Sequence, residues 1–355
     1  DPGETVKCTF TNTLQTGHIV VDKVTDPGAD PQSFSFVTTG SGYSGFSLTD
    51  AAAPNDQTLN AGAYSVSETV PAGWTLTSTN CVSSIADSET AGSLELDAGE
   101  TITCTFTNTK KGHIVVDKVT DPSGDPQSFG FVAGGAGYSN FSLTDAAAPN
   151  NQEVVPGAYS VSETVPAGWD LTSATCDLGE TPASIDVGPG ETVTCTFNNQ
   201  KDAFIVVDKV TDPAGDPTLF DFTTSYGSPF SLADATAPNN SGDLAPGIYS
   251  VSEAAEPGWD PSGASCDDGS PVSAIVLSAG ETVTCTFSNQ KDANIVIVKQ
   301  TDPDGDSQVF NFNRSYGADA GLSDGQSNDS GDLDPGTYSV SEDVPGGWDL
   351  TSATC

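Results

Sequence analysis

Three side chains that could react with one another recur along this chain: a lysine, a glutamate and an asparagine. Lys23, Glu68 and Asn108 alternate with apolar residues in runs typical of β-strands, so each is expected on an apolar face. A lone ionised glutamate buried there costs several kcal/mol unless a partner or a proton neutralises it. The equivalent residues are Lys118, Lys209 and Lys299; Glu163, Glu253 and Glu342; and Asn199 and Asn289.

Two chemistries fit a buried lysine, glutamate and asparagine. The first is an ion pair between lysine and glutamate, with asparagine completing the hydrogen bonds. The second is a spontaneous isopeptide bond. Burial lowers the pKa of a lysine towards a neutral, nucleophilic amine and raises that of a glutamate, whose acid form can polarise the asparagine amide while ammonia leaves. The residues alone leave both open.

These residues sit in a repeat. The stretch at residues 62–74, Gly-Ala-Tyr-Ser-Val-Ser-Glu-Thr-Val-Pro-Ala-Gly-Trp, returns with small changes at 157–169, 247–259 and 336–348, a spacing of roughly ninety residues. We therefore predict four modules. The predicted boundaries are 1–13 for an orphan closing strand, then 14–110, 111–201, 202–291 and 292–355, the last module being incomplete.

Within a module, short β-rich runs alternate with turns rich in Gly, Pro, Asp and Asn, and no helical periodicity is sustained. This pattern predicts an all-β chain: a tandem array of four immunoglobulin-like antiparallel β-sandwiches, the last lacking its closing strand. In the first module the expected strands are 18–25, 34–37, 46–49, 63–70, 74–81, 93–96 and 100–108.

The charge balance excludes several partners. The chain has 49 acidic and 10 basic residues, for a formal net charge of -39. Nucleic acid and anionic membrane surfaces would be repelled by it, so neither is expected as a partner. No stretch of eighteen apolar residues occurs, so membrane insertion is not expected either.

The cysteines recur twice per module without CxxC spacing or clustered histidines, which argues against zinc and redox catalysis. When each cysteine is paired with its nearest neighbour in the sequence of its module, Cys8 and Cys355 remain without a partner. Disulfides place the protein outside the reducing cytosol. The expected pairs are Cys81 with Cys104, Cys176 with Cys195, and Cys266 with Cys285.

Taken together, the first-strand lysine, the Tyr-x-Val-x-Glu-x-x-Pro-x-Gly-Trp box and the Phe-x-Asn of the last strand resemble the Cna-B (prealbumin-like, SpaA-type) repeats of bacterial surface proteins and pilins. The resemblance implies a prealbumin-like β-sandwich in which the lysine is joined to the asparagine under the glutamate. Mapped onto this sequence, the sets are Lys23, Glu68 and Asn108; Lys118, Glu163 and Asn199; and Lys209, Glu253 and Asn289.

The sequence also departs from that family. Tryptophan replaces the usual tyrosine at the end of the box, and disulfides are not a general family feature. No LPxTG-like sorting signal or pilin lysine motif occurs, so polymerisation by a sortase is not implied.

The two ends complement each other. Residues 292–355 contain Lys299, Glu342 and Cys355 but no closing strand, whereas residues 1–13 resemble a closing strand with Cys8 and Asn12. A strand donated by another copy would build a head-to-tail fibre, locked by Cys355 with Cys8 and by Lys299 with Asn12. The alternative is a longer tandem array in which the next repeat supplies the strand.

We therefore expect an extracellular structural protein, a stalk or filament subunit that pairs with copies of itself and needs no cofactor. It is not expected to be an enzyme beyond its own cross-linking, since no nucleophile recurs with a base and an orienting group. The alternative is a ligand-binding adhesin or a calcium-dependent surface repeat. Two Asp-rich loops are either turns or calcium sites: Asp117, Asp121 and Asp125, and Asp302, Asp304 and Asp306.

Overall fold

The computed structural model describes residues 1–12 and 15–355. Residues 13 and 14, where the orphan strand was expected to meet the first module, lie outside the described residues. The chain divides into two compact units, Asp1–Gln200 and Lys201–Cys355. Among the described residues every regular element is a strand, and no helix is long and apolar enough to cross a membrane.

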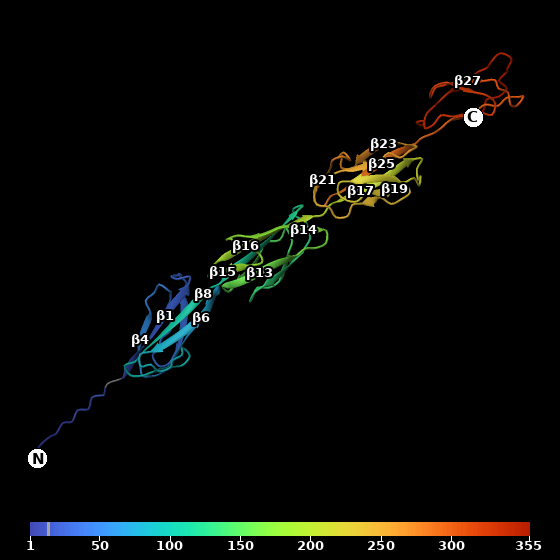
Figure 1. The fold of residues 1–355 in the computed structure, drawn as a ribbon. Coiled ribbons are helices and arrows are strands. Elements are labelled where there is room, and N and C mark those ends of the chain that lie inside the picture. The colour runs from blue at the N-terminus through green and yellow to red at the C-terminus, as the bar shows by residue number, and fades with distance from the viewer. Residues whose placement is uncertain (13–14) are drawn as a thin grey trace. The chain divides into compact units, whose positions relative to one another are not determined.

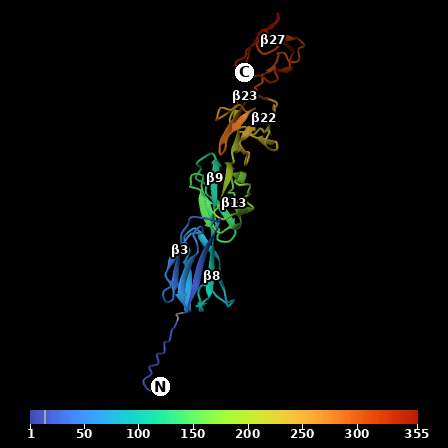
Figure 2. The same ribbon diagram turned by 90° about the vertical axis from the view of Figure 1, so that its left-hand side faces the viewer.

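The first module is a sandwich of two four-stranded sheets. One sheet has the order β4-β1-β8-β6 and the other β3-β2-β5-β7. Figure 1 shows the strands β4, β1, β8 and β6 of the first sheet side by side, and Figure 2 shows β3, from the second sheet, on the opposite side of the module from β8. The strands are β1 (Thr16–Asp26), β2 (Phe34–Thr39), β3 (Phe46–Leu48), β4 (Asn55–Asn60), β5 (Gly62–Thr69), β6 (Trp74–Ser83), β7 (Leu94–Leu96) and β8 (Thr101–Lys110).

The first and last strands of this module pair in parallel. β1 and β8 are neighbours from His18 opposite Thr101 to Asp26 opposite Thr109, while the other strand pairs of the module are antiparallel. A parallel pair needs a long crossover, and here the rest of the module provides it. As a result, the two strands that carry the lysine and the asparagine lie side by side.

Modules 2 and 3 repeat this arrangement. Module 3 differs in that the strand carrying the box is divided into two short strands. Module 2 comprises β9 (Gly112–Asp121), β10 (Phe129–Gly134), β11 (Phe141–Leu143), β12 (Asn150–Val154), β13 (Gly157–Thr164), β14 (Trp169–Cys176), β15 (Ile185–Val187) and β16 (Thr192–Lys201). Module 3 comprises β17 (Phe204–Asp212), β18 (Phe220–Thr224), β19 (Phe230–Leu232), β20 (Asn239–Asn240), β21 (Gly247–Tyr249), β22 (Val251–Glu253), β23 (Trp259–Cys266), β24 (Ile275–Leu277) and β25 (Thr282–Lys291).

The last module is smaller. Its sheets have the orders β26-β29 and β28-β27-β30, and within the described residues 292–355 no strand pairs with β26 as β8 pairs with β1. Its buried core holds only Ile297, Phe310, Phe312 and Leu322. The strands are β26 (Val296–Val298), β27 (Phe310–Arg314), β28 (Ala320–Leu322), β29 (Ser327–Asp329) and β30 (Val340–Asp343).

Each complete module buries alternate residues of both sheets, as the period-two pattern predicts. In module 1, Phe34 packs edge-on against Trp74 at 5.2 Å between ring centroids, and Phe36 packs edge-on against Phe106 at 5.1 Å. A fully buried side chain of this size contributes about 1.5–3 kcal/mol. The two sheets therefore hold together through the face that also carries the lysine.

One strand of module 1, β4, was not predicted from the sequence. β4 contains Asn55, Asp56 and Gln57 and only one buried apolar residue, Leu59, so it lacks an apolar alternation. It pairs with β1 at the edge of the sheet, where solvent covers its outer side. Residues 1–12 form no strand in this structure and are exposed, with Phe10 91% exposed.

Candidate functional site: a buried lysine, glutamate and asparagine

The three predicted side chains of module 1 meet between its two sheets. Lys23 comes from β1 and Asn108 from β8, in one sheet, and Glu68 from β5 in the other. Alternation along each strand turns them to the core face. Lys23 is 2% exposed and Asn108 is 0% exposed, and the Glu68 side chain has no exposed surface.

The lysine gives all its protons to neutral oxygens. Lys23 Nζ donates to Asn108 Oδ1 at 2.8 Å, to the Phe106 carbonyl at 3.1 Å and to the Val24 carbonyl at 2.8 Å. An ammonium group has three protons, so none is left for Glu68. Glu68 Oε1 lies 3.5 Å from Nζ, and neither Glu68 oxygen nor Asn108 Nδ2 has a hydrogen-bond partner. The lysine also lies 4.2 Å from the centre of the Phe34 ring.

Burial acts in opposite directions on the two ionisable groups. It lowers the pKa of Lys23, more strongly than the negative charge of Glu68 raises it. It raises the pKa of Glu68, against the attraction of the Lys23 charge. Both shifts favour the neutral amine and the neutral acid, which are the forms required for amide exchange.

The same geometry recurs in the next two modules. The lysine to asparagine oxygen distance is 2.7 Å for Lys118 and 3.0 Å for Lys209. Burial lowers the pKa of both lysines and raises the pKa of Glu253. The partners in these contacts are Asn199 and Asn289, and the lysine to glutamate distances are 3.5 Å to Glu163 and 3.6 Å to Glu253.

Module 4 brings together two of its three predicted residues. Lys299 Nζ lies 2.7 Å from Glu342 Oε1 and 3.8 Å from the centre of the Phe310 ring. Among the described residues 292–355, β26 pairs only with β29, and no strand lies beside it in the position that β8 holds beside β1, so no residue corresponds to Asn108. Asn12, the residue expected to serve in that role from a donated strand, is exposed in the segment of residues 1–12.

The structure contains the three expected disulfides. Each joins the strand that begins with tryptophan to the closing strand, and in modules 1 and 3 the two cysteines lie directly opposite each other. Cys8 and Cys355 are free and exposed. The bonded pairs are Cys81–Cys104, Cys176–Cys195 and Cys266–Cys285.

The Asp-rich loops are organised by a carboxylate from outside the loop. Asp50 accepts hydrogen bonds from the backbone amides of Thr25 and Ala29, and Asp145 does the same for Thr120 and Gly124. The carboxylates within the two loops considered for calcium do not form a close group among the described residues. The groups that do come close are Asp87, Asp97 and Glu100, and Asp260, Asp292 and Asp334.

A second recurring lysine was missed by the sequence analysis. Lys110, at the end of β8, lies 3.0 Å from Asp30 and 5.7 Å from the centre of the Trp74 ring. In module 3, Lys291 lies 2.8 Å from Asp216 and 5.2 Å from a tryptophan ring, that of Trp259. The signal was present: each complete module carries a lysine two residues after the asparagine.

The fold and these sites define a tandem β-sandwich protein with a buried lysine, glutamate and asparagine in each complete module. The chain matches the SpaA-type prealbumin-like fold domain over residues 19–110 and 114–201, and a second domain of that description over residues 204–287. It therefore belongs to the SpaA-type prealbumin-like fold family, the Cna-B type of repeat. No curated protein matches it.

Among solved structures, the chain is similar to the Bacillus anthracis TIE protein, with 19% identity, a TM-score of 0.34, and coverage of 78% of this chain and 51% of that one. It is similar to the pilus adhesin SpaC of Lactobacillus rhamnosus GG, with 15% identity, a TM-score of 0.24, and coverage of 79% and 44%. It is also similar to BcpA, the major pilin subunit of Bacillus cereus, with 11% identity, a TM-score of 0.32, and coverage of 78% and 100%. The chain spans about half the length of the first two.

Proposed function

We propose that this chain is an extracellular structural protein, a stalk or filament subunit of a pilus-type cell-surface assembly. Its membership of the SpaA-type family supports this, as do the disulfides. In this proposal each complete module is cross-linked internally by a Lys–Asn isopeptide bond. The observation that carries it is the 2.8 Å contact between Lys23 Nζ and Asn108 Oδ1 in the dry core beside Glu68.

The proposed reaction exchanges one amide for another. The neutral Lys23 amine attacks the Asn108 side-chain carbonyl carbon, the new C–N bond forms, and the bond to Asn108 Nδ2 breaks. Glu68 in its acid form polarises the carbonyl, accepts a proton from the lysine nitrogen and passes one to the leaving group, so ammonia departs and Glu68 is unchanged. No oxidant, metal or outside reactant takes part.

A simple ion pair explains the contacts less well. A buried pair stabilises a fold only when good geometry and further hydrogen bonds satisfy both charges. Here both Glu68 oxygens and the Asn108 amide nitrogen lack hydrogen-bond partners, and Glu68 lies 3.5 Å from the lysine nitrogen, whose hydrogen bonds go to neutral oxygens. The positions suit amide exchange, because the nucleophilic nitrogen already contacts the amide it would attack.

We further propose that module 4 is completed by a closing strand from outside residues 292–355. Its core is small, β26 lacks the neighbour that β1 and β17 have, and Lys299 lacks an asparagine. Residues 1–13 carry Cys8, Phe10 and Asn12 in the order of a closing strand. A copy that donates them would join head to tail with the next, and a repeat of a longer array would give the same joint.

The cross-link is tested by peptide mapping of the full chain. After reduction and digestion, a branched peptide should join Lys23 to Asn108, and likewise Lys118 to Asn199 and Lys209 to Asn289. Glu68→Gln keeps the shape of the side chain but cannot shuttle the proton, so it should remove only the first branched peptide. Linear peptides from all three modules of the unaltered chain would refute the proposal.

The joint is tested by the length of assemblies. If residues 1–13 donate the strand, Cys8→Ser or deletion of residues 1–13 should shorten fibres seen by electron microscopy, while Cys81→Ser/Cys104→Ser, which removes a disulfide inside module 1, should not. Fibres of unchanged length after the deletion would rule out this segment as the donor.

A further inference from the structure

The closing strands of modules 1 and 3 each end in a lysine that contacts its own module. Lys110 lies beside the loop residue Asp30 and the ring of Trp74. Lys291 lies in the same way beside Asp216 and the ring of Trp259. Each lysine follows the asparagine of the buried site by two residues, so the lysine and asparagine side chains project from the same face of the strand. In each case the lysine lies near the tryptophan ring at the end of the sandwich, and its ammonium group forms an ion pair with the aspartate.

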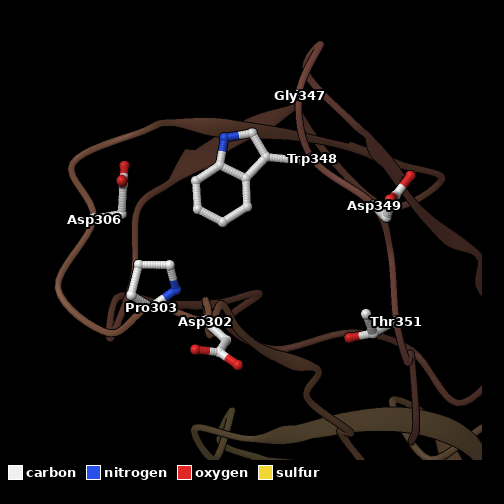
Figure 3. A pocket seen from close by; sticks show the side chains of 7 residues that line it. All are labelled: Asp302, Pro303, Asp306, Gly347, Trp348, Asp349 and Thr351. Carbon is white, nitrogen blue, oxygen red and sulfur yellow. The ribbon is translucent and has the colours of Figure 1, made fainter.

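Module 4 has the same aspartate and tryptophan around an open pocket. Asp306 corresponds in the loop to Asp30 and Asp216, and Trp348 to the other tryptophans. Figure 3 shows the Trp348 ring between the loop bearing Asp306 and the segment bearing Asp349. Trp348 is only partly buried, whereas Trp259 is 7% exposed. The pocket is lined by Asp302, Pro303, Asp306, Gly347, Trp348, Asp349 and Thr351.

Residues 292–355 supply no cation to this pocket. Its basic residues are Lys299 and Arg314. Lys299 pairs with Glu342 in the core, and Arg314 donates to Asn328 and to the Ala318 carbonyl. The carboxylates around Trp348 therefore present a negative surface beside an aromatic ring, which attracts a cation both by charge and through the ring face.

We propose that this pocket receives a lysine from the strand that completes module 4, so that the preferred partner is a closing strand of the form Cys-Thr-Phe-x-Asn-x-Lys. This inference rests on strand completion, as proposed above, and names the sequence of the partner. Such a strand places its cysteine, asparagine and lysine against Cys355, Lys299 and Asp306 at the spacing that modules 1 and 3 use.

The strands that could complete module 4 differ in the residue that would reach this pocket. The closing strands of modules 1, 2 and 3 end in Asn-Thr-Lys, Asn-Gln-Lys and Asn-Gln-Lys, whereas the N-terminal segment has Asn12-Thr13-Leu14. Leucine can pack on Trp348 but offers no charge to Asp306. A strand ending in Asn-x-Lys therefore binds module 4 more tightly than residues 1–14 do.

The test uses the full chain with Cys8→Ser and Cys355→Ser, so that no disulfide forms. Two synthetic peptides of residues 278–291, both carrying Cys285→Ser and Asn289→Ala to prevent covalent bonds, differ only by Lys291→Leu in the second. Binding is followed by the NMR signal of the Trp348 indole N–H, assigned with Trp348→Phe. The lysine peptide should bind about fivefold more tightly, a modest factor because the pair is partly exposed.

Two variants locate the effect. Asp306→Asn should reduce the difference between the peptides to less than twofold, while Asp319→Asn, which removes the same charge from an exposed site of the module, should leave it unchanged. Equal binding of the two peptides to the unaltered chain, or tighter binding of the leucine peptide, would overturn this inference and leave strand completion standing. Binding of neither peptide would contradict strand completion and this inference with it.

Discussion

Lys299 Nζ lies 2.7 Å from Glu342 Oε1, closer than the corresponding lysine and glutamate of any complete module. In those modules the lysine turns to the asparagine oxygen instead. Residues 292–355 contain no closing strand beside β26, and therefore no asparagine equivalent to Asn108, so they show the ion pair that the same lysine and glutamate form on their own. The asparagine is what draws the lysine away from the acid.

This pair makes module 4 sensitive to the loss of one charge. Lys299→Met should destabilise it by about 3 kcal/mol, because Glu342 is left largely buried without a partner. Lys299→Met/Glu342→Gln removes both charges and should recover most of that loss. Hydrogen exchange of β27 measures the stability of module 4 in the two variants. Equal destabilisation by the single and double variants would show that the unpaired Glu342 charge does not cause the loss.

A second prediction concerns Asp216. Its hydrogen bond with Lys291, followed by those with Thr218, lowers its pKa to about 2 from an ordinary value of 3.8. Because the folded pKa is the lower one, the stabilisation is present above pH 3.8 and is lost as the pH falls from there towards 2. Lys291→Met should raise the Asp216 pKa, leaving the Thr218 bonds in place. An NMR titration of the carboxyl carbon measures this, and an unchanged pKa would show that the lysine contact is absent in solution.

The disulfides should stabilise their modules independently of the buried site. Cys266 and Cys285 are 19 residues apart, and a bond closing such a loop contributes about 3 kcal/mol. Cys266→Ala/Cys285→Ala should lower the stability of module 3 by this amount, seen as faster hydrogen exchange in β23 and β25. Module 2 serves as the internal control, and its exchange should not change. Unaltered exchange in module 3 would contradict the prediction.

Packing beside the glutamate strand gives a further prediction. Gly40 has a φ of +115°, and a Cβ there would lie 2.2 Å from Cδ1 of Tyr64 on β5. Gly99 has a φ of +79° with open space around it. Gly99→Ala should cost about 1–2 kcal/mol from backbone strain alone, and Gly40→Ala about 2 kcal/mol more from the overlap. Urea unfolding of both variants measures the difference, and equal losses would count against the packing described.

Much of this architecture was predictable because the chain repeats itself. Alternation placed Tyr64, Val66 and Glu68 on one face, and the structure buries all three side chains. The repeat also predicted the three cysteine pairs that the structure contains. The sequence also showed no closing-strand pattern within residues 349–355. These are local patterns, and local patterns are what a single sequence records best.

The rest depended on distant contacts. The parallel pairing of β1 with β8 joins residues more than eighty positions apart, which no short pattern encodes. β4 was missed because an edge strand facing solvent needs little apolar alternation. The two Asp-rich loops were considered for calcium because their carboxylates are close in sequence, whereas in space Asp145 and Asp324, from outside the loops, accept hydrogen bonds from their backbone amides. The Lys110 contact with Asp30 likewise spans the whole module.

The central claim is that lysine and asparagine are covalently joined in the three complete modules. The intact mass of the full chain, measured after complete reduction of the disulfides, tests it most directly. The account predicts a mass lower than that of the sequence by three molecules of ammonia, and by two in Glu68→Gln after allowing for the substitution. A reduced mass equal to that of the linear sequence would contradict it.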